Sequence, residues 1–206
     1  MNNRGCGQVS LSEARAWIGL GSNLCSPHQQ IIDALTELDQ LPLSRLVVSS
    51  SRYVSRPVGP QDQPDFVNAV AELQTRLSPL ALLDQLQALE QRHRRVRQRH
   101  WGPRTLDLDL LLFQTPSREA SPAEKVSGED QPLLEQSLVH SSYIDQCWQH
   151  PRLTLPHPHM YQRAFVMLPL AEIAPELELP NGRRVAALAA ELATELANDE
   201  VRPVLS

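Results

Sequence analysis

Four stretches of the chain have the apolar pattern of β-strands, namely residues 16–23, 46–54, 66–75 and 105–113. The clearest is 66–75 (FVNAVAELQT), in which side chains alternate between two faces with a period of two residues. One face is expected to carry Val67, Ala69, Ala71 and Leu73, and the other to carry Phe66, Asn68 and Val70. The stretch 46–54 (LVVSSSRYV) is predicted as a strand from its β-branched residues, which favour extended backbone.

Two helices are predicted between these strands, and each begins with a serine followed by a proline. In such a pair the serine caps the helix, and the proline takes the first helical position, where no N–H is needed. Ser26 and Pro27 start the first helix, and Ser78 and Pro79 start the second. The buried faces are expected to contain Ile31, Leu35 and Leu38 in the first helix and Leu82, Leu83, Leu86 and Leu89 in the second. Two more helices are expected at 168–175, with an irregularity at Pro169, and at 183–196.

The order strand, helix, strand, strand, helix, strand predicts a ferredoxin-like βαββαβ sandwich, an α/β (α+β) fold, with additional C-terminal helices. Residues 1–14 are expected to form a flexible tail, and 15–206 a single domain with a polar insertion at about 114–150. Within that insertion, 133–150 could form a short helix. The length of 206 residues, with 41% hydrophobic and 21% charged residues, suits one globular domain. This fold by itself implies no function.

The sequence lacks the usual features of a secreted or membrane protein. Its first 15 residues contain no apolar core like that of a signal peptide, and no run approaches the roughly 18 apolar residues that a membrane helix needs. The three cysteines are an odd number without CxxC spacing, which argues against a disulfide framework. We therefore expect a cytoplasmic protein with no membrane partner.

Positive charge is concentrated in one segment of a chain whose formal net charge is -5. That net charge argues against a protein whose whole surface binds nucleic acid. Six arginines nevertheless follow Glu90 closely, and they are Arg92, Arg94, Arg95, Arg97, Arg99 and Arg104. Because guanidinium groups match pairs of phosphate or carboxylate oxygens, this segment is expected to bind anions.

Two aspartates, Asp107 and Asp109, interrupt the strand-like run TLDLDLLLF. On a strand, residues two apart project from the same face, about 6.6 Å apart along the backbone. Both carboxylates could face solvent on an edge strand, they could share one proton, or cations could lie between them. Because the nearby arginines outnumber the two acids, additional anions are expected. Phosphates bridged to the aspartates by Mg²⁺ would use both features, which favours phosphoryl transfer.

Several separate motifs resemble one known family, the 6-hydroxymethyl-7,8-dihydropterin pyrophosphokinases. They are GSNL at 21–24, RPVGPQDQPDFVNAV at 56–70, WGPRTLDLDLLLF at 101–113 and LPHP at 155–158. The similarity spans roughly residues 16–180 apart from the insertion, and the motifs occur in the family's order. The resemblance implies that ATP is a co-substrate. It also implies that a diphosphate passes from ATP to the hydroxymethyl group of the pterin and that AMP is released, in folate biosynthesis.

The resemblance also assigns roles to individual residues. Asp107 and Asp109 would hold two Mg²⁺ ions that bridge the triphosphate, and Asp107 would help to take the hydroxyl proton. Arg95, Arg97 and Arg104 would stabilise charge on the transferred and leaving groups. Within 91–100 the alignment to the family leaves open a shift of one residue in which arginine takes each role. The ATP-binding positions are Gln87, Arg97, Trp101, Arg104, Leu110, Thr154, His157 and Arg163. The pterin-binding positions are Gly21, Ser55, Val58, Phe66, Asn68 and Phe165, with Phe66 and Phe165 stacking on the ring and the backbone near Ser55 and Val58 completing the pocket.

Two other kinds of site are compatible with parts of the sequence. Cys147, His150, His157 and His159 have plausible spacings for a zinc site, although prolines on both sides of His157 do not preorganise a tetrahedral cage. A ferredoxin-like sheet with an arginine-rich arm could instead bind RNA, but the stretch 66–75 lacks the series of aromatic residues that stacks bases. We therefore expect small-molecule partners, no nucleic acid, and a monomer.

Overall fold

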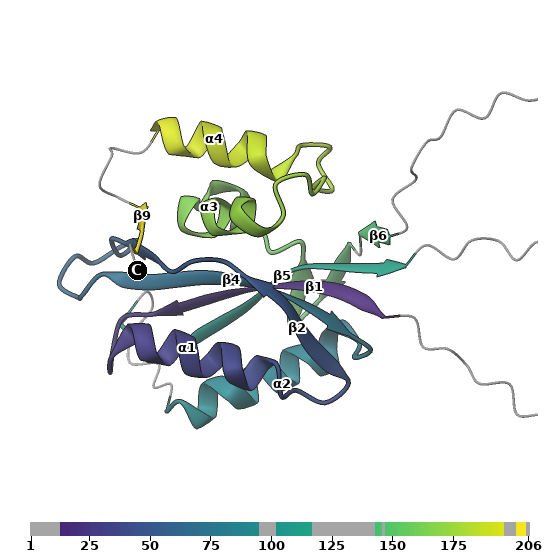
Figure 1. Ribbon diagram of the computed structural model, residues 1–206, viewed down its shortest axis with the longest axis horizontal. Coiled ribbons are helices and arrows are strands. Elements are labelled where there is room, and N and C mark those ends of the chain that lie inside the picture. Colours follow the sequence, from purple (N-terminus) through teal and green to yellow (C-terminus); the bar gives the residue numbers. More distant parts are fainter. Residues whose placement is uncertain (1–12, 95–101, 117–142, 146, 196–200, 205–206) are drawn as a thin grey trace, which may run out of the picture.

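The computed structural model describes residues 13–94, 102–116, 143–145, 147–195 and 201–204, and in this part of the chain one antiparallel sheet lies between two layers of helices. Figure 1 shows helices α1 and α2 on one face of the sheet, with α3 and α4 on the other. The long central strands are β1 (Ala14–Ser22), β4 (Phe66–Thr75) and β5 (Asp107–Pro116). The sheet order is β6-β5-β1-β4-β3-β9, and β2 also pairs with β4.

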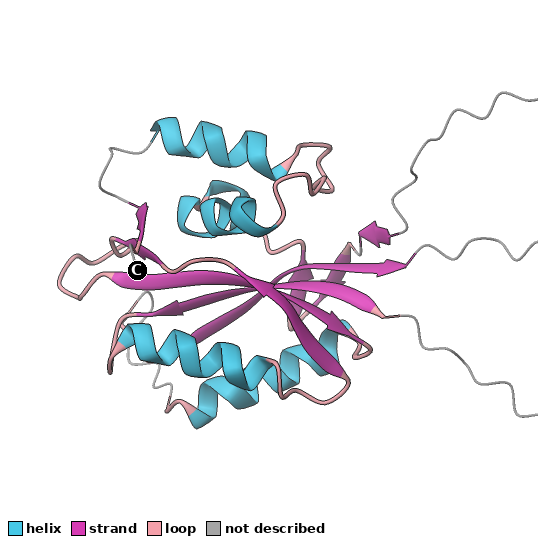
Figure 2. Ribbon diagram, viewed as in Figure 1, coloured by secondary structure: helices cyan, strands magenta, loops and turns pink. Residues whose placement is uncertain are grey.

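The remaining strands are short. They are β2 (Ser44–Ser49), β3 (Tyr53–Ser55), β6 (Tyr143–Asp145) and β9 (Val201–Pro203) in the main sheet, and β7 (Trp148–His150) and β8 (Leu153–Leu155) in a separate two-stranded sheet. The helices are α1 (Pro27–Leu38), α2 (Pro79–Arg92), the 3-10 helix η1 (Met160–Gln162), α3 (Ala164–Ile173) and α4 (Val185–Glu195). Figure 2 shows the helices, in cyan, on both sides of the strands of the main sheet, in magenta. The predicted ferredoxin-like βαββαβ order with C-terminal helices is confirmed. No helix in the described part of the chain has the length and hydropathy needed to cross a membrane.

The sheet is covered by apolar residues on both faces, as its strand patterns require. On the face toward α1 and α2, the core contains the four predicted β4 residues Val67, Ala69, Ala71 and Leu73. On the face toward α3 and α4, Val70 of β4 packs in a second cluster that includes Trp17 and Leu111. The predicted leucines of α2 are all buried in the first cluster. Burial on both faces makes the central strands a rigid frame for the residues at their ends.

The predicted strand 46–54 is two strands, because Ser50 breaks it. The backbone N–H of Ser50 donates to Val70 O at 2.8 Å, and its Oγ accepts from Val70 N at 3.0 Å. The Ser50 hydroxyl thus accepts the hydrogen bond from Val70 N that a backbone carbonyl would accept in a regular strand pair. As a result β2 and β3 pair separately with the two halves of β4.

The closing helix predicted at 183–196 is present as α4, and the two predicted serine caps had different outcomes. Ser78 caps α2, with Oγ accepting from Ala81 N at 3.3 Å. Ser26 has a left-handed backbone (φ 64) and makes no side-chain hydrogen bond to its helix, so its predicted capping role was wrong. Strand β5 starts at Asp107 and continues past Phe113 to Pro116, and 143–150 contains two short strands where a helix was considered.

Candidate active site

Three residues form a row across the sheet where β1, β4 and β5 lie side by side. Gly21 of β1 lies opposite Asn68 of β4 on one side and opposite Asp107 of β5 on the other. Two inter-strand steps separate Asn68 from Asp107 by about 10 Å. A Cβ added to Gly21 would lie 3.5 Å from Asn68 Oδ1 and 3.9 Å from Asp107 Cβ. Because glycine has no side chain, the floor between the amide and the carboxylate stays open.

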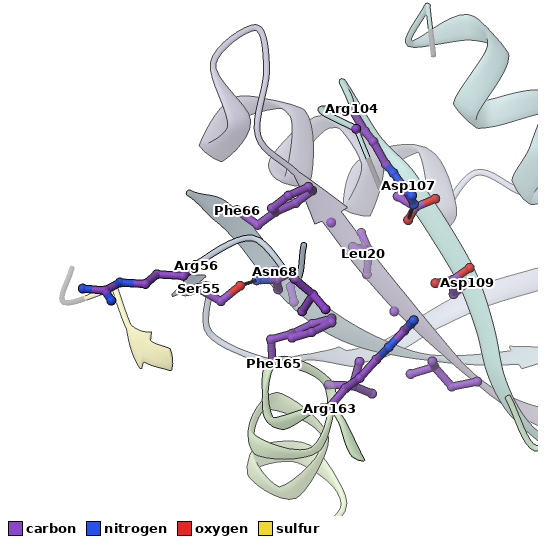
Figure 3. A pocket seen from close by; sticks show the side chains of 17 residues that line it. Leu20, Ser55, Arg56, Phe66, Asn68, Arg104, Asp107, Asp109, Arg163 and Phe165 are labelled. Carbon is purple, nitrogen blue, oxygen red and sulfur yellow. Dashed lines mark hydrogen bonds and ion pairs between the residues drawn. The ribbon is translucent and has the colours of Figure 1, made fainter. Parts of the chain in front are cut away.

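A pocket lies over this row, and it is shown in Figure 3. All six predicted pterin-binding residues line it, namely Gly21, Ser55, Val58, Phe66, Asn68 and Phe165. Four residues predicted for catalysis or ATP binding also line it, namely Arg104, Asp107, Asp109 and Arg163. Segments far apart in the sequence therefore meet in one cavity.

The two phenylalanines come from opposite sides of this pocket. Phe66 is the first residue of β4, and Phe165 belongs to the first turn of α3. In Figure 3 their rings lie on either side of Asn68. Both rings are only partly buried, although phenylalanine side chains are usually buried in a core. A flat heteroaromatic ring placed between them would contact both π faces.

Asp107 and Asp109 face the pocket, while the residues between and after them face the core. Leu108 and Leu110 are buried in the cluster under α1 and α2, so the two aspartates and these two leucines lie on opposite faces of the strand. Arg104 Nη1 forms an ion pair with Asp107 Oδ2. Figure 3 shows the Arg163 side chain extending toward Asp109. The strand thus presents two carboxylates, each with an arginine nearby.

The environment of Asp109 disfavours its charged form. Burial raises the pKa of Asp109 to about 7, and repulsion by Asp107 and Glu90 adds to this effect. The guanidinium groups of Arg163 and Arg104 act in the opposite direction, but they do not cancel it. A cation between the carboxylates would relieve this repulsion.

The donor set suits a hard divalent cation that brings other ligands with it. Within the described residues no three His, Cys, Asp or Glu side chains are grouped as a metal site, so the protein supplies two carboxylates here. Mg²⁺ is commonly bound by one or two carboxylates together with phosphate oxygens and water, and Asp107 and Asp109 fit that pattern. Within the same part of the chain, Cys147, His150, His157 and His159 are not grouped as a zinc site would require.

The other predicted ATP-binding residues that the structure describes, Gln87, Leu110, Thr154 and His157, do not line this pocket. Gln87 lies exposed on α2, and its Oε1 is 3.5 Å from Arg152 Nη2 at the β7–β8 turn. Thr154 lies on β8, and the side chain of Leu110 is buried in the core. Burial and the positive charge of Arg163 lower the pKa of His157 to about 4, so this ring is neutral near pH 7. Arg95, Arg97 and Trp101 lie outside the described residues.

Two buried polar residues at the site were missed from the sequence. Asn23 Oδ1 accepts from Arg104 N at 2.7 Å, and its Nδ2 donates to Gln63 Oε1 at 3.1 Å, which joins the loop before β4 to Arg104. Glu90 Oε1 accepts from Leu108 N at 2.8 Å, directly between the two aspartates of β5. A signal for Glu90 was available, because it is four residues after Leu86 and thus on the apolar face of α2.

Comparison with known proteins gives consistent matches. The family model described as 7,8-dihydro-6-hydroxymethylpterin-pyrophosphokinase matches residues 17–175. The chain is similar to the 2-amino-4-hydroxy-6-hydroxymethyldihydropteridine pyrophosphokinase of Pseudomonas aeruginosa, with 47% identity over 176 residues, which are 85% of this chain and 90% of that protein. The protein of the same name from Haemophilus influenzae is 44% identical over 178 residues, 86% of this chain and 92% of that one.

Solved structures with the same fold include Plasmodium falciparum HPPK-DHPS A437G with pteroate. That structure has a TM-score of 0.61 and 13% sequence identity, and it covers 97% of this chain. The chain spans about half of that longer protein, 48% of its length. Wild-type HPPK-DHPS from the same organism with pteroate gives a TM-score of 0.62 at 14% identity, covering 94% of this chain and 46% of that one.

Proposed function

This chain belongs to the 7,8-dihydro-6-hydroxymethylpterin-pyrophosphokinase family, and from that membership we propose that the pocket over Asn68, Gly21 and Asp107 is its active site. The chain is an ATP-dependent pyrophosphokinase of folate biosynthesis. It transfers a diphosphate from ATP to 6-hydroxymethyl-7,8-dihydropterin. A bond forms between the hydroxymethyl oxygen and the β-phosphorus of ATP. The bond from that phosphorus to the oxygen that bridges the α- and β-phosphates breaks, and AMP leaves with this oxygen.

In this proposal the pterin lies between Phe66 and Phe165. The two rings offer stacking surfaces, and the amide of Asn68 offers a hydrogen bond at the edge of the bound ring. Gly21 leaves room for the pterin to lie over β1. With its ring edge at Asn68, the molecule would extend its hydroxymethyl group across the open floor toward Asp107.

In this arrangement Asp107 and Asp109 would hold two Mg²⁺ ions, which the triphosphate would also bind. Bound Mg²⁺ neutralises phosphate charge and orients the phosphates for attack. Asp107 lies opposite Gly21, over which the pterin would lie, and this supports the proposal that Asp107 would help to take the hydroxyl proton. Arg104 and Arg163 both line the pocket and would stabilise negative charge on the transferred group. Arg95 would stabilise charge in the same way.

The nucleoside part of ATP would extend away from the pterin. Arg152 places the β7–β8 turn beside Gln87 of α2, so these segments can form one wall beyond Asp109. Thr154 and His157 belong to the chain that follows this turn, and Arg97 and Trp101 would also contact ATP. Because the side chain of Leu110 is in the core, only its backbone could contact the nucleotide.

One observation carries the site assignment: a row across one face of the sheet in which a glycine separates an amide from a carboxylate, with a phenylalanine on either side of the amide. The test is to incubate the protein with ATP, Mg²⁺ and 6-hydroxymethyl-7,8-dihydropterin and to separate the nucleotides. AMP and the pterin diphosphate in equal amounts are expected, and chelating the metal should abolish both. ADP as the product, or unchanged activity after chelation, would contradict the proposal.

Family membership favours this enzyme over the RNA-binding module considered from the arginine-rich segment. The cytoplasmic location, the monomeric state and the single domain with an insertion at about 114–150 stay predictions from the sequence.

A further inference from the structure

The amide of Asn68 has two different ends, and the end that faces the pocket decides what a ligand must offer. Its Oδ1 can only accept hydrogen bonds, and its Nδ2 can only donate them. The side chain is almost fully buried, with 5% of the residue exposed, so it cannot turn to water instead. The orientation of this amide is therefore a property that the surrounding protein must set.

Two acceptors on β3 hold the nitrogen end. Asn68 Nδ2 donates to Ser55 Oγ at 2.9 Å and lies 3.5 Å from the carbonyl oxygen of Tyr53, which is directly opposite Asn68 in the sheet. A carbonyl oxygen cannot donate. Rotating the amide by half a turn would therefore place Asn68 Oδ1 against the oxygen of Tyr53 and lose that interaction.

With Nδ2 held by β3, the oxygen end faces the other way. Asn68 Oδ1 lies toward Gly21, 3.5 Å from the point where a Cβ on that glycine would be. Gly21 lines the pocket, so this oxygen is at the pocket wall. In Figure 3 the Ser55 and Asn68 side chains meet between the two phenylalanines.

Of the two contacts, the one to Ser55 is shorter and is the one that a substitution can remove. Ser55 is itself buried, with 4% exposed, so no water from bulk solvent replaces its hydroxyl easily. Without that hydroxyl, the amide would keep only the long contact to Tyr53 and could rotate.

We propose that Ser55 is a positioning residue that fixes the Asn68 amide with its oxygen toward the pocket, so that the site selects heterocycles presenting an N–H donor there. This inference rests on the proposed function of the pocket. A reduced pterin carries such donors on its ring, whereas a planar ring with only acceptors at that edge would face an acceptor. Ser55 thus contributes to substrate selection through its side chain, beyond the backbone role that its position implies.

The first test compares Ser55→Ala with Ser55→Thr. Ser55→Ala should raise the KM for the pterin about tenfold, the effect of losing one buried hydrogen bond, and leave the KM for ATP unchanged. Ser55→Thr keeps the hydroxyl and should restore most of the pterin affinity. Ser44→Ala is a matched control on the same sheet, because its Oγ bonds Thr75 Oγ1 at 2.7 Å and Ser44 does not line the pocket.

A double-mutant cycle separates this inference from the site assignment. In the Asn68→Ala background, Ser55→Ala should cause no further rise in the pterin KM, since there is no amide left to orient. An equal tenfold rise in both backgrounds, or no rise in Ser55→Ala alone, would overturn the positioning role. If Asn68→Ala itself left the pterin KM unchanged, the pocket assignment would be wrong. Calorimetric binding of the pterin and thermal unfolding of each variant distinguish these outcomes from a folding defect.

Discussion

At the level of single residues, the site depends on a position that carries no side chain. Gly21 lies between Asn68 and Asp107 in the sheet, and any larger residue would project into the space where the substrate is proposed to lie. The two polar groups can act on one molecule only because this middle position is empty.

Gly21→Ala tests that interpretation. The added Cβ would lie 3.5 Å from Asn68 Oδ1, an ordinary van der Waals distance, so the variant should fold with unchanged or slightly higher thermal stability. The methyl group would still project into the space that the pterin is proposed to occupy over β1. We expect the KM for the pterin to rise by about tenfold or more while the KM for ATP changes little, as measured by steady-state kinetics. Unchanged pterin kinetics would place the substrate elsewhere.

His157 predicts a pH dependence of stability. Its folded pKa of about 4 is below the value near 6.5 of an unfolded histidine. The unfolded chain therefore takes up this proton first as the pH falls, and the free energy of unfolding should decrease between about pH 6.5 and pH 4. Denaturant unfolding across that range should show a weaker pH dependence in His157→Gln. The exposed His28→Gln is the control, and identical pH profiles for all three proteins would contradict the prediction.

Much of the site was predictable from the sequence because its residues occur in motifs. Asp107 and Asp109 were also indicated by physics, since two carboxylates in a strand need a compensating partner. The hydrogen bond between Ser55 and Asn68 was not predictable, because it depends on the register between β3 and β4. The bridging role of Asn23 likewise depends on two loops that meet only in the folded chain.

At the level of elements, α3 supplies Phe165, Arg163 directly precedes this helix, and Glu172 attaches the helix to the sheet. Glu172 Oε1 accepts from Ser51 N at 2.9 Å and from Ser51 Oγ at 2.8 Å. Its Oε2 accepts from Tyr53 OH at 3.0 Å. Burial and the Glu172 carboxylate raise the pKa of Tyr53 to about 12, which keeps the phenol protonated as the donor. One carboxylate therefore joins α3 to the segment that leads into β3.

Glu172→Gln should weaken this connection. The amide can still accept from Ser51, but its nitrogen cannot accept from Tyr53 OH, so the helix should hold Phe165 less firmly. We expect a lower midpoint of thermal unfolding and a pterin KM raised about threefold, with little effect on the KM for ATP. Glu176→Gln is the matched control, because Glu176 is exposed and its ion pair with the exposed Arg184 should contribute little to stability. Equal effects in both variants would mean that Glu172 contributes only surface charge.

The elements themselves were predicted well where the apolar period was long and clear, as in β4 and α2. Short elements were not. The break at Ser50 could not be inferred. In a run rich in β-branched residues, the sequence is the same whether the serine hydroxyl faces solvent or replaces a backbone hydrogen-bond partner. Ser26 has the usual residue type for a cap, yet its left-handed backbone turns the side chain away from that role.

At the level of the whole molecule, the fold brings three long strands together so that polar residues of β4 and β5 lie at one end of the sheet. Helices on both faces bury the apolar sides of β1, β4 and β5, as Figure 1 shows. Only at one end does a face of these strands open into the pocket, between Phe66 and α3. The rigid sheet thus positions Asn68, Asp107 and Asp109. The segments that precede β5 and α3 supply Arg104 and Arg163.

The most direct test of the central claim is the rate of AMP formation by Asp109→Ala, compared with wild type and with Asp33→Ala on the distant helix α1. If Asp107 and Asp109 together hold the metal and the phosphates, turnover in Asp109→Ala should fall by about 100-fold or more. Thermal stability should not decrease, because a poorly solvated charge is removed. Asp33→Ala should remain fully active. A near-normal rate of AMP formation in a folded Asp109→Ala protein would contradict the account.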